Sequence, residues 1–232
     1  MIPSQVEMRR GLAYTYRSMI ALGIETSEPI GSVALLSDGS LAEERTLDRP
    51  LSHAESLLPA MHDLLEDSGI AKEKIDRIVV NRGPGSFTGL RIGLAAAKGL
   101  AQALDIPLIG VDGMSVFRLR YASHRRLCVI LPSRRDLRFA QWFSGDRANG
   151  EIELLRESQL AERLATEKRM LSVTGSGAQG ILDRMSDHPW IQHASENGTE
   201  ASALWVARAG LERQSIDQLY EVEPLYVEPV LA

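Results

Sequence analysis

The most informative stretch of the sequence is Asn81-Arg82-Gly83-Pro84-Gly85-Ser86-Phe87-Thr88-Gly89-Leu90-Arg91-Ile92-Gly93. It joins a predicted strand, Ile75 to Val80, to a helix predicted from about Phe87 to Leu104. Glycines at 83 and 85 let the backbone approach another group closely, and the free amides at a helix start favour an anion. The stretch contains neither the P-loop lysine pattern nor Gly-x-Gly-x-x-Gly. It therefore predicts either a phosphate contact or a tight strand-to-helix turn that needs glycine for its geometry.

The helix after this turn carries small residues at every fourth position. These residues are Gly89, Gly93, Ala97 and Ala101, and their spacing places them on one face. Because the helix is apolar around most of its girth, we expect it to have two packing partners. One partner is the predicted sheet. The other is either a helix of a second subunit or the first helix of this chain, predicted at about Ser52 to Ser68, and the sequence leaves both alternatives open.

The rest of the chain predicts two α/β units. Strands at 20–26, 32–36 and 41–47 are joined by tight turns into an antiparallel meander, which the following strand-helix units extend into a mixed sheet. Strands and helices alternate again in the second half, after a boundary near residues 112–115. The predicted elements there are strands at 127–131, 138–144, 151–155 and 171–174, and helices at 159–165, 178–185 and 201–212.

The composition is that of an ordinary globular protein. The 232 residues are 44% hydrophobic and 25% charged, which excludes a disordered chain. The net charge of -5 argues against a strongly basic nucleic-acid binder, and a single cysteine, Cys128, excludes an intrachain disulfide. No stretch approaches the roughly 20 apolar residues of a membrane span, so we expect a cytoplasmic protein. Residues 1–18 precede the regular apolar pattern and are interpreted as an N-terminal extension.

One charge cluster departs from the acidic total. Seven arginines against one acid, Asp136, give the span from Arg118 to Arg138 a local charge of +6. The cluster is either a contact for the phosphates of RNA or for an acidic partner, or a solvated surface balanced by acids elsewhere. Its arginines stand at 118, 120, 125, 126, 134, 135 and 138.

His53 is the first candidate for a metal ligand. A second ligand one helical turn later would stand at position 57, which is occupied by Leu57. The other histidines show no metal-ligand spacing, and Cys128 lies among apolar residues that predict a buried packing role. The sequence contains no Gly-x-Ser-x-Gly nucleophile motif. We therefore expect no metal site and no catalytic residue.

Several groups of residues together resemble the TsaB (YeaZ) family. They are Ile24-Glu25-Thr26-Ser27, His53-Ala54-Glu55, the stretch Gly83 to Gly93, Gly110-Val111 and Glu223-Pro224-Leu225-Tyr226. The resemblance covers about residues 19–232 and is strongest up to Ser115. It implies an actin-like ATPase (ASKHA, ribonuclease H-like) α/β fold with two mixed-sheet lobes. We expect the first lobe, with the partner-binding helices, at 19–113, and the second lobe with the C-terminal tail at 114–232.

The resemblance implies a function in forming threonylcarbamoyladenosine next to the anticodon of tRNAs that read codons beginning with A. In this family TsaD is the catalytic subunit, and TsaB is a non-catalytic scaffold and activator that binds TsaD through a helical bundle. The ATPase TsaE joins them, tRNA is contacted through the complex, and TsaB alone is expected to form a homodimer.

The alternative function is that of a stand-alone ATP-dependent transferase or metal-dependent hydrolase with the actin-like fold. TsaD-like members bind metal through two histidines one helical turn apart, whereas here His53 is followed by Leu57. Actin-like ATPases use an aspartate where this chain has Glu25. Both differences argue against the alternative.

The resemblance also implies where binding takes place. The expected interface with the partner consists of His53, Leu57, Met61, Leu64, Gly89, Gly93 and Ala97. A phosphate or nucleotide contact is expected at Thr26, Ser27, Gly83, Gly85 and Ser86. We expect no cofactor of the chain's own, and ATP or ADP at the interface with the partner.

Overall fold

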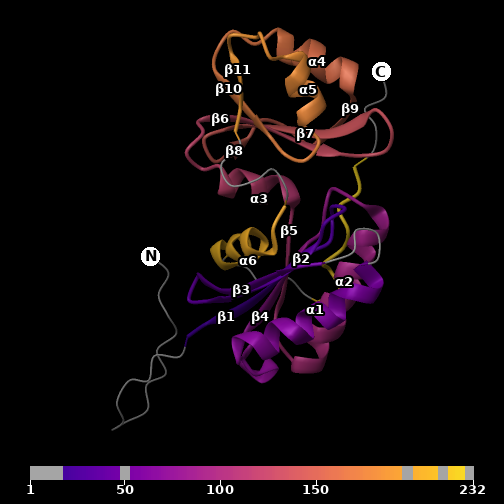
Figure 1. Ribbon diagram of the computed structural model, residues 1–232, viewed down its shortest axis with the longest axis vertical. Helices are drawn as coiled ribbons and strands as arrows, with labels where there is room; N and C mark the ends of the chain where they lie inside the picture. The colour runs from indigo at the N-terminus through magenta and orange to yellow at the C-terminus, as the bar shows by residue number, and fades with distance from the viewer. Residues whose placement is uncertain (1–17, 48–52, 195–200, 214–218, 228–232) are drawn as a thin grey trace.

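The computed structural model describes residues 18–47, 53–194, 201–213 and 219–227. They form two lobes, each built on its own sheet, which lie one above the other in Figure 1. The first sheet consists of β1 (Ile20–Glu25), β2 (Ser32–Ser37), β3 (Ser40–Thr46), β4 (Arg77–Asn81) and β5 (Leu108–Val111). The second sheet consists of β6 (Arg126–Pro132), β7 (Leu137–Ser144), β8 (Arg147–Ala148), β9 (Glu153–Arg156), β10 (Leu171–Thr174) and β11 (Ile191–His193).

The two sheets share one topology. The first has the order β3-β2-β1-β4-β5, with β3, β2 and β1 antiparallel and β1, β4 and β5 parallel. The second has the order β8-β7-β6-β10-β11, with β7 antiparallel to β6 and to its other neighbours, and with β6, β10 and β11 parallel. A meander extended by parallel strands therefore occurs twice, which confirms the prediction of two mixed-sheet α/β lobes.

Each sheet is covered by helices on both faces, and its strands alternate between the two cores. In the first lobe Leu22, Ile24 and Ile78 pack towards α1 and α2, whereas Val79 packs towards α6. In the second lobe Cys128 and Ile130 belong to the core beneath α4 and α5, and Leu127 and Val129 to the core beneath α3. The helices are α1 (His53–Ser68), α2 (Phe87–Leu104), α3 (Gly113–Arg120), α4 (Glu157–Ala165), α5 (Gln179–Arg184) and α6 (Ala203–Glu212), with a short 3-10 helix η1 (Lys72–Lys74).

Helices α3 and α6 lie between the two sheets and pack against each other (Figure 1). α3 follows the last strand of the first sheet, yet its Met114 and Phe117 join the core of the second sheet. α6 follows the last strand of the second sheet, and its Ala203 and Ala207 pack on the first. Gly23 permits this contact, because a Cβ there would lie 2.2 Å from the Ala203 carbonyl oxygen. The last helix of the first half, α3, thus packs on the second sheet, and the last helix of the second half, α6, packs on the first.

The structure differs from the sequence-based elements mainly around these two helices. The expected lobe boundary assigns α6 to the second lobe, whereas its packing places it on the first sheet. α3 is not predicted at all, although Asp112 marks its start by accepting a hydrogen bond from the Ser115 amide at 2.8 Å. The short strands β8 and β11 are not predicted either. Of the proposed N-terminal extension, residues 1–17 lie outside the described residues.

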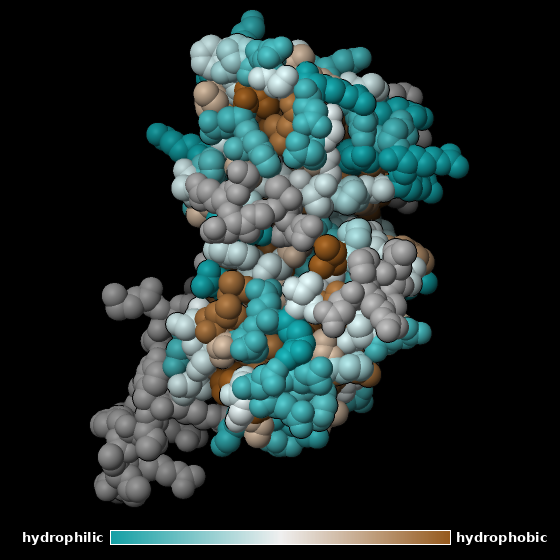
Figure 2. All heavy atoms as spheres, viewed as in Figure 1, coloured by the Kyte–Doolittle hydropathy of each residue, from teal (hydrophilic) through white to brown (hydrophobic). Residues whose placement is uncertain are grey.

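On the face seen in Figure 2, hydrophobic residues surface in both lobes among hydrophilic ones. Most of the second lobe is hydrophilic there, apart from one hydrophobic area near its outer end, and hydrophobic residues surface in several small areas of the first lobe. Within the described ranges, no helix is long and apolar enough to cross a membrane.

Candidate functional site

The candidate site lies where β1 and β4 end and α2 begins. β1 and β4 are parallel neighbours, so the segments 26–31 and 82–86 leave the same edge of the sheet. The Ser86 amide donates to the Ser27 carbonyl at 2.7 Å, which joins the two segments directly. Ser86 also begins α2, because its Oγ accepts a hydrogen bond from the Gly89 amide at 3.2 Å.

A buried carboxylate organises both segments. Glu25 is fully buried, and its two oxygens accept hydrogen bonds from the Ser27 amide at 2.5 Å and from Asn81 Nδ2 at 2.6 Å. Asn81 also donates to Ser27 Oγ at 3.1 Å and accepts from the Gly83 amide at 2.9 Å. Burial raises the pKa of the Glu25 carboxyl, against the lowering effect of the hydrogen bonds from Ser27 and Asn81. The network therefore fixes the two segments to one another.

The start of α2 approaches the end of β1 so closely that no side chain fits between them. A Cβ on Gly89 would lie 2.0 Å from the Thr26 carbonyl oxygen, and a Cβ on Gly93 would lie 2.2 Å from Thr26 Oγ1. Thr26 Oγ1 donates to the Gly89 carbonyl at 2.9 Å across this contact. Gly89 and Gly93 are therefore explained by packing within the chain, chiefly against Thr26 after β1. Of α1, the helix that the sequence offers as one alternative partner, His53 lies 3.3 Å from the Gly89 Cβ position.

The residues expected to contact phosphate are brought together, but their polar groups form hydrogen bonds within the chain. Thr26 and Ser27 take part in the hydrogen bonds given above, and Ser86 caps the helix. A Cβ on Gly85 would lie 2.3 Å from the Ser27 carbonyl oxygen, and Gly83 has a φ of 118° beside the Leu225 carbonyl. The glycines are thus required by the tight turn itself, in agreement with the second interpretation of this stretch.

The seven residues expected at the partner interface are all buried within the chain. His53 lies at the start of α1, where its Nε2 donates to the Glu28 carbonyl at 2.9 Å. The others pack in the first core or against Thr26; they are Leu57, Met61, Leu64, Gly89, Gly93 and Ala97. Their side chains present no outer surface to a partner. The helices do have exposed faces, but these are formed by other residues, among them Leu58 at 61% exposed and Phe87 at 53%.

Sequence reasoning missed Glu28, which links the two lobes. Its side chain is buried, with one oxygen accepting a hydrogen bond from Ser176 Oγ and the other from the Ala201 amide at 3.1 Å. Ser176 lies between β10 and α5 in the second lobe. The sequence signal at this position is the turn Ser27-Glu28-Pro29, which predicts a loop but not a carboxylate that faces the other lobe.

No metal site is formed around His53. Among the residues that the structure describes, no three His, Cys, Asp or Glu side chains are grouped so that they could hold a metal ion. Cys128 is buried in β6, and burial raises the pKa of its thiol far above the ordinary value. A buried neutral thiol of this kind acts as a packing group.

Comparison with known proteins identifies the family. A protein from Bacillus subtilis named tRNA threonylcarbamoyladenosine biosynthesis protein TsaB is 35% identical over 211 residues, which are 86% of this chain and 90% of that protein. This chain belongs to the TsaB family. The family model described as TsaD, tRNA N6-adenosine threonylcarbamoyltransferase, matches residues 50–141.

Solved structures place this TsaB-family chain in the expected fold class. YeaZ from Pseudomonas aeruginosa has a TM-score of 0.73 and 27% identity, and the match covers 90% of this chain and all of that one. The ADPNP-bound activator of 2-hydroxyisocaproyl-CoA dehydratase from Clostridium difficile has a TM-score of 0.55, over 84% of this chain and 95% of that one. At 10% identity the second match concerns the fold alone. The predicted actin-like α/β fold of two lobes is confirmed.

The contact between α2 and β1 predicts opposite effects for two alanine substitutions in one helix. Gly89→Ala places a methyl group against the Thr26 backbone and should lower the free energy of unfolding by about 1–3 kcal/mol. Gly99→Ala is the matched control, because its Cβ would meet nothing within 4 Å; it should raise the free energy of unfolding by about 0.5–1 kcal/mol. Urea denaturation measures both, and equal effects of the two substitutions would contradict the packing role of Gly89.

The raised pKa of Glu25 predicts how stability depends on pH. The folded state holds the proton of this carboxyl to higher pH than the unfolded chain, so its contribution is lost as pH rises from about 4.3 through the raised pKa. The free energy of unfolding of the wild type should therefore fall with pH relative to Glu25→Gln, which cannot ionise. Urea denaturation over this pH range measures the difference, with the exposed Glu73→Gln as control. A free energy of unfolding of the wild type that rises with pH relative to Glu25→Gln would contradict the assignment.

Proposed function

We propose that this chain is a non-catalytic companion subunit in the formation of threonylcarbamoyladenosine on tRNA, and that it binds the transferase TsaD through the exposed faces of α1 and α2. One observation carries the proposal. The polar groups at the candidate site bond to one another, whereas apolar residues on the two helices face outward. The arrangement therefore favours a role in holding a partner over a role in chemistry.

The outer face of α2 fits close contact with another helix. Ala95, Gly99 and Ala103 are exposed and spaced by four, and no atom lies within 4 Å of the Cβ position of Gly99. Leu58 on α1 adds a large exposed apolar side chain. Small residues let helix backbones approach closely, and an exposed leucine on the first helix supplies apolar area to bury. These residues replace the buried ones that the sequence had indicated.

The family comparison supports TsaD as the occupant of this face. The TsaD family model matches residues 50–141, a range that includes both α1 and α2. A protein of that family therefore carries a related pair of helices, and two related pairs can meet around an approximate two-fold axis. The same reasoning supports a homodimer of this chain when TsaD is absent. Within the proposal, TsaE joins the pair and tRNA is bound by the assembled complex.

Nucleotide binding at the interface with TsaD stays a prediction. Thr26, Ser27 and Ser86 already bond within the chain, and the Glu28 carboxylate bonds to Ser176 in the second lobe. ATP or ADP at this interface would therefore contact other groups or require these bonds to open. The role proposed for this chain does not depend on such a contact.

The proposal predicts which surface substitution breaks the complex. Leu58→Glu places a charge on the outer face of α1 and should weaken binding to TsaD about tenfold or more, because an unpaired charge is costly to bury at an interface. Leu41→Glu on β3 is the matched control, since Leu41 is also exposed, at 45%, on another element of the same lobe. Isothermal titration calorimetry with purified TsaD measures both affinities.

Reconstitution of tRNA modification completes the test. Formation of threonylcarbamoyladenosine should require this chain, should fall with Leu58→Glu and should persist with Leu41→Glu. Full modification without the chain would overturn the companion role. Full modification with Leu58→Glu, together with unchanged affinity, would overturn the assigned surface. Buried positions such as Leu57 are unsuitable for this experiment, because a charge there would unfold the first core.

A further inference from the structure

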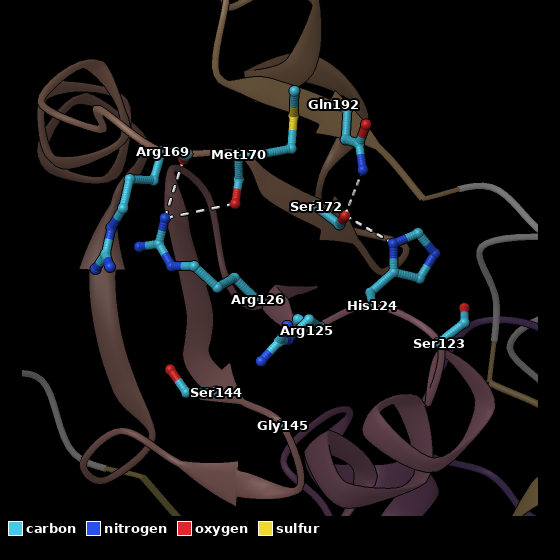
Figure 3. A pocket seen from close by; sticks show the side chains of 10 residues that line it. All are labelled: Ser123, His124, Arg125, Arg126, Ser144, Gly145, Arg169, Met170, Ser172 and Gln192. Carbon is cyan, nitrogen blue, oxygen red and sulfur yellow. Dashed lines mark hydrogen bonds between the residues drawn. The ribbon is translucent and has the colours of Figure 1, made fainter.

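A polar pocket lies in the second lobe, at the edge where β6 and β10 begin (Figure 3). It has a volume of about 770 Å³ and is lined by residues from the end of α3 to β6, the turn after β7, and the starts of β10 and β11. None of its lining residues belongs to the candidate site in the first lobe. Ten residues line it, and none is an acid: Ser123, His124, Arg125, Arg126, Ser144, Gly145, Arg169, Met170, Ser172 and Gln192.

The structure resolves the arginine cluster into groups with separate roles. Arg118 is buried and donates to three backbone carbonyls of residues 121–124 and to Asp146. Arg138 pairs with Glu157. Arg134 and Arg135 are exposed in the turn at the far end of β6. The +6 span is therefore not one patch, and only Arg125 and Arg126 of the seven line the pocket.

One wall of the pocket is fixed by Arg126. Its guanidinium binds both carboxylate oxygens of Glu167, at 3.2 and 2.9 Å, and donates to the Arg169 carbonyl at 3.0 Å. Glu167 neutralises this arginine and holds the segment before β10 in place. Arg126 thus positions Arg169, which Figure 3 shows beside it on the same side of the pocket.

The opposite wall consists of polar side chains held by hydrogen bonds. Ser172 is buried in β10 and is paired in the sheet with Gln192 of β11. Its Oγ lies 2.7 Å from His124 Nδ1 and accepts a hydrogen bond from Gln192 Nε2 at 2.8 Å, as Figure 3 shows. This chain of three side chains links the loop after α3 to β10 and β11. The wall is therefore built by the fold rather than by mobile surface residues.

Two positive charges at the pocket have no compensating acid. Arg125 and Arg169 are exposed, and neither forms an ion pair or a side-chain hydrogen bond with any residue in the described part of the chain. Figure 3 places Arg125 between the two walls. Two free guanidinium groups beside hydroxyl and amide groups match the oxygens of phosphate. The lining has no aromatic side chain other than His124, so it provides little surface on which a nucleic-acid base could stack.

We propose that this pocket binds phosphodiester groups of an RNA strand. The choice of RNA as the source of the phosphate rests on the proposed function, in which this chain belongs to a complex that modifies tRNA. The pocket recognises backbone and not sequence, because its free donors suit phosphate oxygens. Its contribution is an electrostatic contact on the second lobe, away from the α1–α2 face assigned to TsaD.

The test uses the full chain and an unmodified tRNA transcript, titrated at several salt concentrations. Affinity falls as salt rises, so the slope of log affinity against log salt is negative. The double variant Arg125→Gln/Arg169→Gln should make this slope shallower by about 1.4–1.8, the loss expected for two phosphate contacts. Arg134→Gln/Arg135→Gln is the matched control, because it removes the same charge from exposed arginines at the other end of β6. It should leave the slope close to that of the wild type. Arg126 is kept in both variants because it holds the wall.

Each other outcome overturns the proposal. Equal loss of slope in the two double variants would indicate a general charge effect, and no tRNA binding by the wild-type chain would exclude RNA. Binding of pyrophosphate, ATP or poly-glutamate that depends on Arg125 and Arg169, without tRNA binding, would assign the pocket to a free anion or to an acidic protein. The experiment contains no TsaD, so its failure is distinct from failure of the companion role, which the reconstitution measures.

Discussion

The first lobe depends on the contact between the start of α2 and the end of β1, where two glycines replace side chains. Gly89 and Gly93 bring the helix against the backbone and hydroxyl of Thr26. This approach sets the position of α2 and leaves Thr26 and Ser27 buried beside it. Glu25 and Asn81 then satisfy the polar backbone groups that this burial removes from water. The tight turn, the buried carboxylate and the exposed outer face of α2 all follow from this close contact between α2 and the segment after β1.

The same segment also connects the lobes. After Thr26 and Ser27 the chain reaches Glu28, whose carbonyl is held by His53 and whose carboxylate bonds to Ser176 and to the Ala201 amide in the second half. The carboxylate of this loop thus bonds directly to the other half of the chain. A fixed arrangement of the lobes suits the companion role that we propose, with one partner surface on α1 and α2 and another on the second lobe.

The sequence predicts those features that arise from neighbouring residues. The meander, the helices α1 and α2, and the glycine-rich turn follow from periodicity and turn residues, and the resemblance supplies the lobed fold. It does not predict which side of a helix is buried when both sides are apolar, so Leu57 and Gly93 were assigned to an interface although the chain itself covers them. Glu28 and the Arg125–Arg169 pocket were missed because they unite residues far apart in the chain. The repeat of topology is invisible for the same reason: the two lobes share strand order without evident sequence similarity.

The exchange of α3 and α6 determines how the two lobes unfold. Each half of the chain supplies strands to its own sheet but sends its last helix to complete the core of the other sheet. A fragment that ended before α6 would leave Ala34, Leu36 and Val79 of the first sheet open to water. Neither half is therefore an autonomous folding unit, in spite of its self-contained sheet, and the two lobes should melt together in a single cooperative transition.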